Sequence, residues 1–411
     1  MRSICLLLFC AVSMHSVTSQ AQSIDPRKVL ESQLWKSYVA QIGANYETTV
    51  DYAYLAHSCE THLTEVSVSS FEDGIDLCIA TTLAEIDPSG SYDNPSEYKR
   101  KQKESQQPFI GIALELRNQK KLGEPLVVVS AIANGPGERA GILPGDKILA
   151  ADGVALSPLS LTESIAALRG PVGSRVSLSI QRGDAVLELS AVRKEIRVNY
   201  VRAQSFDNGA FYCRVSFFRK GVTTSQFFAL LKNTLAAQEP NALILDLRNN
   251  PGGALEEVTA FASLLVPPNT RLLASVTRPE PEFLVSKSEI DSVQGRTSQT
   301  DELLARIPLY VLVNSQTASG AEALALILKQ HRGAIVVGSK TAGTNLVQRR
   351  LILDGQAAIT ITTGRLVSAS GQSWRDRGVP IDVHAPETNG HEFGTPDDAV
   401  LAAALHQMAR K

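Results

Sequence analysis

The pattern of apolar and polar positions divides the chain into three regions that predict different structures. Between residues 24 and 104, apolar positions recur at helical spacing, with polar breaks at residues 87–88 and 94–95. From residue 109 to about residue 193, short apolar runs are separated by glycine turns, which is typical of strands. From residue 195 onward, strand-like and helix-like segments alternate, and this alternation predicts a sheet covered by helices.

The middle region follows a charged stretch at residues 98–104, which we interpret as a solvated helix end or a linker. Residues 161–168 have a helical pattern, and residues 141–146 read Gly-Ile-Leu-Pro-Gly-Asp. The expected strands are residues 109–116, 126–132, 147–150, 176–181 and 186–192.

The last region contains two places where a buried strand turns directly into a helix. Apolar residues 243–247 run into a Pro-Gly-Gly turn at residues 251–253, before a helical pattern begins. Apolar residues 309–313 are followed by a short turn with Ser319 and by a helix over residues 321–330. The other expected elements are a strand at 209–218, a helix at 225–238, a hairpin at 351–362 and a closing amphipathic helix at 396–408.

These two turns carry the residues that point to chemistry. A hydroxyl at the start of a helix is exposed and faces the positive end of the helix dipole, where a developing oxyanion is favoured. Gly252 and Gly253 allow backbone amides to approach a substrate oxygen closely. Each feature alone also has a structural explanation, because serine often caps a helix and Gly-Gly often forms an ordinary turn.

Taken together, three segments of the last region resemble the tail-specific, or C-terminal processing, serine peptidases. They are Leu-Arg-Asn-Asn-Pro-Gly-Gly at residues 247–253, Ala-Ser-Gly-Ala-Glu at residues 318–322, and a Gly-x-x-Thr-x-Gly loop within residues 338–348 that ends in Val-Gln. The resemblance implies that the α/β core has the crotonase-like fold of that family. It also implies that the chain is a serine endopeptidase.

By this resemblance, Ser319 matches the family nucleophile, and the amides of Gly253 and Gly320 match its oxyanion hole. Gln348 matches the glutamine that orients the catalytic lysine. The lysine itself should follow Gly343, but this chain has Thr344 there. A serine is a weak nucleophile until a neighbouring group takes its proton, and a threonine hydroxyl is too weak a base to do so.

No other residue is identified as the base. Lys340, on the same loop, is a candidate substitute, and His331 follows the helix after Ser319. In many relatives a histidine occurs in an upstream Asp-Pro-His segment, but here residues 87–89 read Asp-Pro-Ser. Two functions therefore stay open: an endopeptidase with an altered base, and a catalytically silent pseudopeptidase that binds C-terminal peptides or acts as a scaffold.

The middle region resembles a PDZ domain, on the Gly-Ile-Leu-Pro-Gly-Asp motif and the strand pattern. The resemblance implies that Phe109, Ile110, Gly111 and Ile112 form the loop whose amides receive a peptide's C-terminal carboxylate. The expected partners are therefore protein or peptide C-termini. The alternative is a domain that only packs against its neighbours.

Composition limits the remaining functions. The chain has 411 residues, of which 44% are hydrophobic, and can bury more than one core. Its net charge of −2 gives no basic footprint for nucleic acid. We expect no cofactor and no metal site, since no Cys/His spacing supports one.

The N-terminal residues predict a secretory signal that is cleaved after Ala21, because Arg2 precedes an apolar run at residues 4–12. We therefore expect an exported protein without a membrane span. In a Gram-negative source this protein would be periplasmic.

The expected organisation is a multidomain α/β chain. After a signal peptide at residues 1–21 we expect a helical region at 22–105, a PDZ domain at 106–194 and a peptidase-like core with a C-terminal helix at 195–411.

The cysteines of the mature chain give two further expectations. Cys59 and Cys78 could form a disulfide in an oxidising compartment. Cys213 lies in a strand-like run and is expected to be buried.

Overall fold

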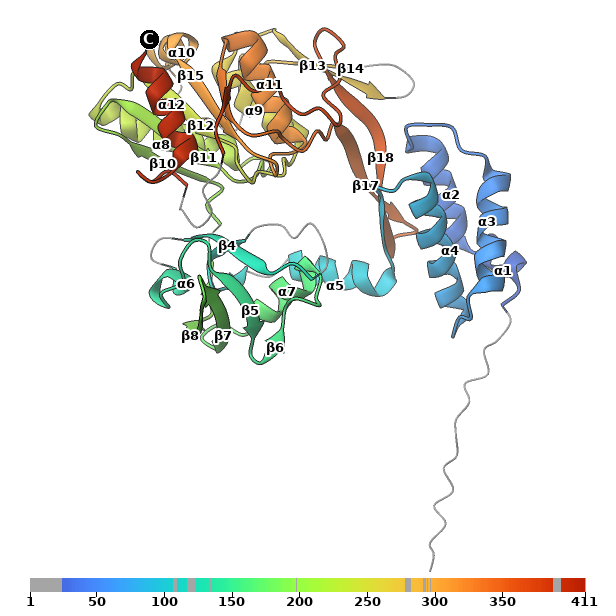
Figure 1. Ribbon diagram of the computed structural model, residues 1–411. Coiled ribbons are helices and arrows are strands. Elements are labelled where there is room, and N and C mark those ends of the chain that lie inside the picture. Colours follow the sequence, from blue (N-terminus) through green and yellow to red (C-terminus); the bar gives the residue numbers. More distant parts are fainter. Residues whose placement is uncertain are drawn as a thin grey trace, which may run out of the picture. The chain divides into compact units, whose positions relative to one another are not determined.

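The computed structural model describes residues 24–105, 109–116, 123–132, 135–196, 198–277, 282–290, 293, 295, 297–386 and 393–410. The chain forms two compact units (Figure 1). One contains the described residues up to Gln102 together with Gln348–Thr362, and the other contains Lys103–Val347 and the chain from Thr363 onward. The predicted signal peptide and its cleavage site at residues 1–21 lie outside the described residues.

The first unit is mainly helical, as the spacing of its apolar residues predicts. A side chain caps the start of each of its first four helices, which places polar groups where backbone amides lack partners. A disulfide between Cys59 and Cys78 joins α3 to α4 and confirms the expected bond. The helices are α1 (Pro26–Glu31), α2 (Gln33–Asn45), α3 (Tyr52–Glu65), α4 (Phe71–Ile86) and α5 (Pro95–Ser105).

A hairpin from late in the sequence completes this unit. Strands β17 (Leu346–Leu353) and β18 (Ala357–Ser368) form it, and it is longer than the expected residues 351–362. Leu353, Ile359 and Ile361 are fully buried in the same core as the helices. A short strand that the sequence pattern did not predict, β1 (Ser91–Asp93), pairs antiparallel with β18.

The PDZ region forms its own small core beneath a sheet of order β3-β4-β5-β7-β8. The expected strand at residues 109–116 is broken into two at Ile112 and Ala113, and β2 pairs with β9 instead of the main sheet. The elements are β2 (Ile110–Gly111), β3 (Leu114–Leu116), β4 (Leu126–Ala131), α6 (Pro136–Arg139), β5 (Lys147–Ala151), β6 (Val154–Ala155), α7 (Leu161–Leu168), β7 (Arg175–Arg182), β8 (Ala185–Val192) and β9 (Lys194–Glu195).

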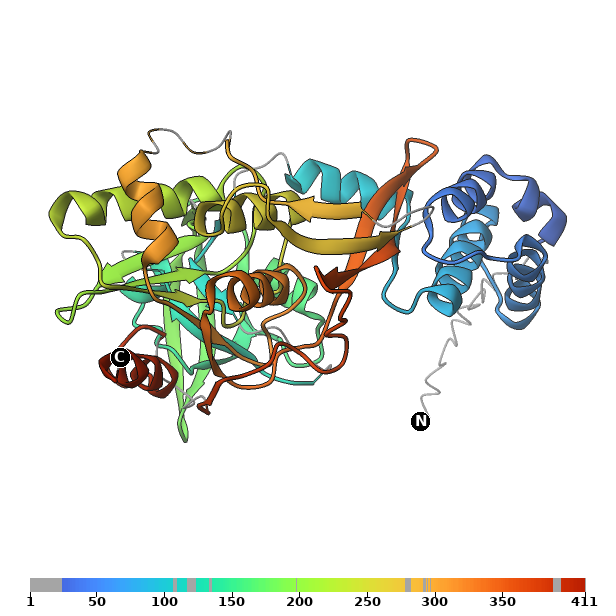
Figure 2. The same cartoon turned by 90° about the horizontal axis from the view of Figure 1, so that it is seen from above.

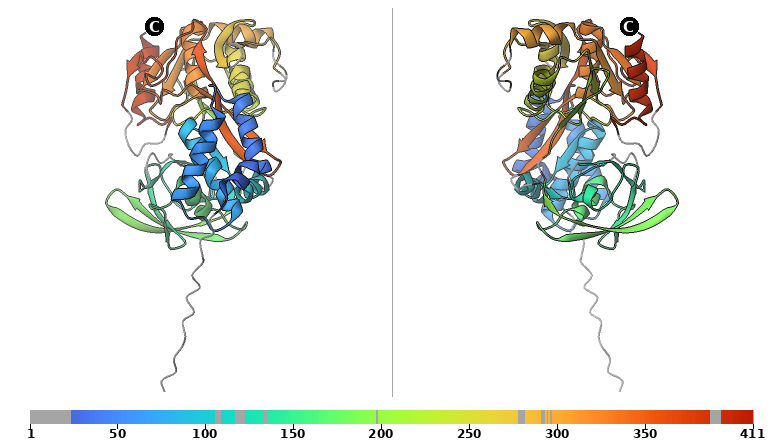
Figure 3. Two further views of the ribbon diagram at one scale, coloured as in Figure 1. Left: turned by 90° about the vertical axis from the view of Figure 1, so that its right-hand side faces the viewer. Right: turned by 90° about the vertical axis from the view of Figure 1, so that its left-hand side faces the viewer.

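The α/β core is a sheet of order β10-β11-β12-β15-β16-β19 that is parallel except for the pair β10–β11. Alternate side chains of its strands enter two different clusters, one shared with α8, α9 and α11 and the other with α12. Helices therefore cover both faces (Figures 2 and 3). The strands are β10 (Val201–Ser205), β11 (Ala210–Val215), β12 (Ala242–Asp246), β15 (Leu309–Val313), β16 (Ile335–Gly338) and β19 (Val383–His384).

The core helices are α8 (Thr223–Ala237), α9 (Leu255–Leu265), α10 (Ser298–Arg306), α11 (Gly320–Arg332) and α12 (Ala399–Ala409). A second sheet pairs β13 (Arg271–Thr277) with β14 (Glu282–Val285) and with the far part of β18. Cys213 is fully buried on β11, as expected. Within the described residues, no helix has the length and apolar character needed to cross a membrane.

Candidate active site

Ser319 lies on the strained turn between β15 and α11. Its φ of +50° and ψ of −117° fall in a region that residues with a side chain rarely adopt. Such strain persists only where the surroundings impose it, and it is concentrated at functional sites. Here the surroundings are a fully buried strand on one side and a helix with nine buried residues on the other, so the half-buried serine is held rigidly at the sheet edge.

The Pro-Gly-Gly turn after β12 approaches Ser319 so closely that only glycine fits. Gly252 and Gly253 have φ values of +103° and +141°. A Cβ added to Gly252 would lie 2.7 Å from the nitrogen of Gly320, and one added to Gly253 would collide with the carbonyl of Phe218. The turn and the start of α11 are therefore in direct backbone contact.

This contact brings together the two amides that the sequence assigned to the oxyanion hole. A Cβ on Gly320 would lie 3.5 Å from the nitrogen of Gly253, which shows how near the two backbones come. The neighbouring backbone groups are paired, since Phe218 N donates to Gly252 O at 2.9 Å and Ala254 N donates to Phe218 O at 2.9 Å. The amides of Gly253 and Gly320 donate to no residue that the structure describes, so both are available to a substrate oxygen.

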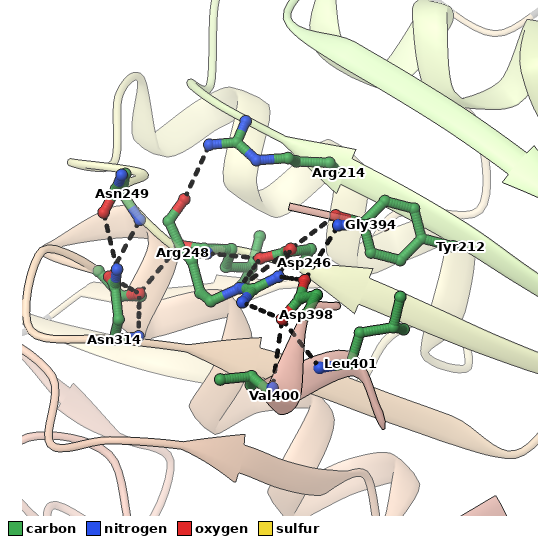
Figure 4. Close-up of polar contacts among 12 residues, drawn as sticks. Tyr212, Arg214, Asp246, Arg248, Asn249, Asn314, Gly394, Asp398, Val400 and Leu401 are labelled. Carbon is green, nitrogen blue, oxygen red and sulfur yellow. Dashed lines mark hydrogen bonds and ion pairs between the residues drawn. The ribbon is translucent and has the colours of Figure 1, made fainter. Parts of the chain in front are cut away.

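Hydrogen bonds between the two turns fix their relative position. Strands β12 and β15 are parallel neighbours, so both turns leave the same edge of the sheet. Ala318 N donates to Asn250 O at 3.0 Å, and Thr317 Oγ1 donates to Leu247 O at 2.9 Å. The side chains of Asn249 and Asn314 are also bonded, at 2.7 Å (Figure 4).

A buried cluster of charges anchors the base of the Pro-Gly-Gly turn (Figure 4). Arg248 Nε donates to Asp246 Oδ1 at 3.0 Å, and its Nη1 donates to Asp398 Oδ1 at 2.8 Å. Tyr212 OH donates to Asp246 Oδ2 at 2.6 Å. Burial disfavours the Asp246 carboxylate, but Arg248 more than compensates and lowers the pKa of Asp246. Because Arg248 lies only three residues before Pro251, the cluster fixes the chain where it enters the turn.

A second buried arginine connects this cluster to the PDZ domain. Arg214 on β11 makes a two-pronged ion pair with Glu115 on β3, with Nη1 to Oε2 at 3.0 Å. Its Nη2 also donates to the carbonyl of Arg248 at 3.3 Å. The strand that borders the PDZ groove is therefore tied to the backbone just before the oxyanion turn.

One cavity of about 760 Å³ joins the PDZ groove to the Ser319 turn. Its PDZ wall contains the predicted carboxylate loop, strand β3 and the inner face of α7, and its core wall contains the loops before Gly252 and before Ser319. The lining residues are Phe109, Gly111, Ile112, Ala113, Leu114, Glu115, Leu116, Leu161, Ile165, Leu168, Arg169, Ser216, Asn249, Pro251, Ser315, Gln316, Ala318 and Ala342.

Comparison with known proteins gives the same assignment. Residues 197–385 match the model of peptidase family S41, and residues 127–182 match a PDZ domain model. The carboxyl-terminal-processing protease of Synechocystis sp. is 31% identical over 319 residues, which cover 76% of this chain and 71% of that protein. The chain belongs to the carboxyl-terminal-processing protease family.

Other members agree in sequence and in fold. The carboxy-terminal-processing protease of Bartonella bacilliformis is 28% identical over 77% of this chain and 71% of its own length. The solved structure of a photosystem II D1 C-terminal processing protease superimposes with a TM-score of 0.59, at 22% identity, over 88% of this chain and 93% of that one. The helical region, PDZ domain and S41 core predicted from the sequence are thus confirmed as the fold.

Glu322, a residue to which the sequence gave no role, organises the loop that should carry the family lysine. Its buried carboxylate accepts hydrogen bonds from four donors on two segments, which are Ser319 N at 3.1 Å, Thr341 Oγ1 at 2.5 Å, Gly343 N at 2.8 Å and Thr344 N at 2.8 Å. Burial raises the pKa of the Glu322 carboxyl, and these hydrogen bonds oppose the shift. With all four donors directed at it, Glu322 has no free position from which to accept the Ser319 proton.

The position of the missing lysine is therefore next to the nucleophile. The amides of Thr344 and Ser319 donate to the same oxygen of Glu322. The carbonyl of Thr344 accepts a hydrogen bond from Trp374 Nε1 at 3.2 Å, which fixes the other side of the residue. A lysine at position 344 would start from a backbone already held beside Ser319.

Neither alternative base has the required environment. Lys340 is exposed, whereas a lysine lowers its pKa and acts as a base when it is desolvated. His331 lies at the far end of α11, about 18 Å from Ser319 by the rise of an α-helix. A role of Lys340 as a substitute base therefore stays a prediction that its exposure does not favour.

Gln348 and Ser89 belong to the first unit, whereas Ser319 and Thr344 belong to the second. Gln348 is exposed on β17, and its Nε2 donates to the carbonyl of Ser89 at 2.7 Å. Ser89 occupies the position of the histidine that many relatives carry. The structure thus brings Ser319, Gly253, Gly320 and Thr344 together, while a catalytic role of Gln348 stays a prediction.

Proposed function

We propose that the protein captures the C-terminal tails of other proteins in its PDZ groove and cleaves them slowly with Ser319. The observation that carries this proposal is a cavity lined both by the PDZ groove and by the turn that carries Ser319. A tail bound along β3 extends the PDZ sheet and leaves its upstream residues directed at the core wall. The tail is thereby held close to the nucleophile, which reduces the entropy cost of attack.

In the proposed reaction, Ser319 Oγ attacks the scissile carbonyl and forms a tetrahedral intermediate. The amides of Gly253 and Gly320 stabilise its negative oxygen, because they are already oriented and unpaired within the described structure. The intermediate then collapses as its C–N bond breaks, the tail leaves as an amine that takes up a proton from solvent, and the upstream part of the substrate stays on Ser319 as an ester. Water hydrolyses this ester and releases the upstream part. These steps need the residues that the two turns supply.

This site lacks a positioned base to accept the proton of Ser319. Thr344 supplies a hydroxyl where the family has an amine, so the proton passes to solvent rather than to a positioned base. Loss of a general base costs a factor of roughly 10²–10⁴ in rate. We therefore expect turnover well below that of relatives with the lysine.

Thr344 also favours a second function, in which the protein binds C-terminal tails without cutting them. The two functions differ in one experiment, which follows the degradation of an unstructured protein with an apolar C-terminus. The variants are wild type, Ser319→Ala and Thr344→Lys. Slow cleavage by wild type that disappears in Ser319→Ala supports the peptidase, and cleavage by Thr344→Lys alone supports the binding protein.

A binding assay tests whether the PDZ groove captures C-terminal tails, whether or not the protein also cleaves them. A short peptide with an apolar C-terminus should bind wild type and Ser319→Ala equally. It should not bind Gly111→Asp, because a carboxylate in the loop repels the carboxylate of the peptide. Equal binding to all three proteins would remove the PDZ groove from the proposed function.

We also propose that the protein works outside the cytoplasm. The apolar residues 4–12 after Arg2 support a secretory signal, and the Cys59–Cys78 disulfide is of the kind that persists in oxidising compartments. The N-terminal sequence of protein purified from the periplasm of an expressing Gram-negative host should begin just after Ala21. Retention of the full-length chain in the cytoplasm would contradict this localisation.

A further inference from the structure

The core wall of the cavity consists of three chain segments that are bonded to one another. Ala318 N donates to Asn250 O at 3.0 Å, and Ala342 N donates to Thr317 O at 3.0 Å. These bonds join the Pro-Gly-Gly turn, the turn that follows β15 and the loop that follows β16. Because backbone bonds connect all three segments, the wall presents a fixed surface to a bound chain.

The side chains of this wall are small or uncharged. None of the described core residues that line the cavity carries a charge. A charged side chain that packs against this wall loses water and gains no counter-ion, which is costly. The wall therefore favours an uncharged segment of substrate. Its residues are Ser216, Asn249, Pro251, Ser315, Gln316, Ala318 and Ala342.

Gln316 carries the accessible carboxamide of this wall. Ser216 Oγ donates to Tyr200 O at 3.2 Å. Asn249 Oδ1 accepts from Asn314 Nδ2 at 2.7 Å, and Asn249 Nδ2 is itself buried. Gln316 is half-buried, and its carboxamide makes no hydrogen bond within the part of the chain that the structure describes. Its donor and its acceptor are therefore both available at the cavity.

The backbone that carries this side chain is held in place. Gln316 N donates to Asn314 Oδ1 at 3.1 Å, and Asn314 N donates to Thr317 Oγ1 at 2.9 Å. Gln316 precedes Ser319 by three positions, so their Cα atoms are at most about 11 Å apart. An extended chain advances about 3.3 Å per residue, so Gln316 lies within about three substrate residues of the scissile bond.

The direction of the captured tail decides which substrate residues pass this wall. The C-terminus lies beside β3, and the chain runs upstream from there to Ser319, so the residues that follow the scissile bond lie along the core wall. An extended backbone offers amide donors and carbonyl acceptors along its edge, and a carboxamide can pair with one of each. A carboxylate or an ammonium group could pair with only one kind.

From these observations we propose that Gln316 binds the substrate backbone just after the scissile bond and thereby selects an uncharged segment there. This inference rests on the proposed function and names the stretch of substrate, outside the PDZ groove, that the core reads. Proteins with an uncharged segment upstream of the captured tail are then bound more tightly than proteins with the same tail after a charged segment.

The test is a fluorescence anisotropy titration of the full chain, with Ser319→Ala in every protein so that no peptide is cut. A labelled peptide of about four residues fills only the groove beside β3. A second peptide, of about twelve residues, adds an upstream segment of Ser, Ala and Gly and is about 40 Å long when extended. The parent should bind the long peptide about tenfold more tightly than the short one. Gln316→Met should lose most of this gain and bind the short peptide as the parent does, because two neutral hydrogen bonds are removed.

A charge exchange shows whether the side chain contacts the segment. Two further long peptides carry Asp or Lys in place of the upstream Ser residues, and the parent should bind both more weakly than the neutral peptide. Gln316→Lys should bind the Asp peptide about tenfold more tightly than the Lys peptide. Gln238→Lys is the matched control, because Gln238 is an exposed glutamine of the same core that does not line the cavity. It should behave as the parent does.

The outcomes separate this inference from tail capture. Equal affinity of the parent for the long and the short peptide would overturn the contact with the core wall and leave tail capture intact. A loss in Gln316→Met that is equal for both lengths would also overturn it, because that pattern indicates altered packing. The same charge preference in Gln238→Lys would overturn the assignment to Gln316. No binding of the short peptide to the parent would overturn tail capture itself.

Discussion

The PDZ side and the core side of the shared cavity differ in which of the groups expected from the family they contain. The PDZ end has two loop amides, those of Ile112 and Ala113, that donate to no described residue, and an apolar wall formed partly by α7. The core end of the cavity is lined by Ser315, Gln316 and Ala318, on the turn that carries the strained Ser319. The loop beside this turn has a threonine, Thr344, at the position of the family base. We propose that recognition of a tail and chemistry on that tail can be varied separately in this chain. The following predictions test that proposal.

The largest expected effect comes from restoring the base. Thr344→Lys should raise kcat on an unstructured protein by roughly 10²–10⁴, because the position is already held beside Ser319 by Glu322. The affinity for a C-terminal peptide should not change. Thr344→Met, which has an unbranched side chain without a base, is the control and should give no gain. An equal gain from methionine and lysine would contradict the proposed role of this position.

Removing the charge beneath the oxyanion turn should unfold the catalytic end first. Arg248→Met leaves the carboxylates of Asp246 and Asp398 buried without the guanidinium that pairs with both, and should lower the free energy of unfolding by about 3–5 kcal/mol. Urea denaturation measures the change. Lys220→Met removes an exposed ion pair with Glu256 and should have little effect on the midpoint. If the two variants unfolded at the same urea concentration, the cluster would have no anchoring role.

The oxyanion amide can be removed without touching the tail site. Gly253→Ala places a Cβ against the carbonyl of Phe218 at a φ that alanine rarely adopts, so the amide must move. In the Thr344→Lys background, kcat should fall by roughly 10²–10³, and peptide affinity should remain. Gly355→Ala, at a positive φ in the exposed turn between β17 and β18 with open space around it, controls for backbone strain. Full activity of Gly253→Ala would remove this amide from the oxyanion hole.

The smallest expected effect concerns the ion pair between Glu115 and Arg214, which joins the PDZ domain to the α/β core. Glu115→Gln weakens the ion pair with Arg214 that ties β3 to the backbone before the oxyanion turn. In the Thr344→Lys background, we expect about a tenfold loss of kcat, since small misplacements of a bound substrate are costly. The dissociation constant of a C-terminal peptide should change little. A loss of affinity with unchanged kcat would indicate that Glu115 contacts the tail instead.

Local signals in the sequence were sufficient to predict both catalytic turns. The Pro-Gly-Gly turn and Ser319 each follow a buried apolar strand, and parallel neighbouring strands bring such turns to one sheet edge. The position of Thr344 beside Ser319 followed from motif spacing within the family. The split of residues 109–116 into two strands was not visible, because it depends on the pairing of β2 with the distant β9.

Features that depend on distant partners were not predictable. The pairing of β1 with β18 involves only three residues of β1, and nothing in its own sequence identifies a partner more than 250 positions away. Glu322 was visible within a motif, but its four donors converge only after the loop at 341–344 returns to α11.

The most direct test of the central claim is a comparison of wild type with Ser319→Ala over a long incubation with an unstructured protein that has a free apolar C-terminus. Mass spectrometry should detect C-terminal fragments from wild type and none from Ser319→Ala. Fragments that form at the same rate with both proteins, or with neither, would contradict the claim that Ser319 cleaves captured tails.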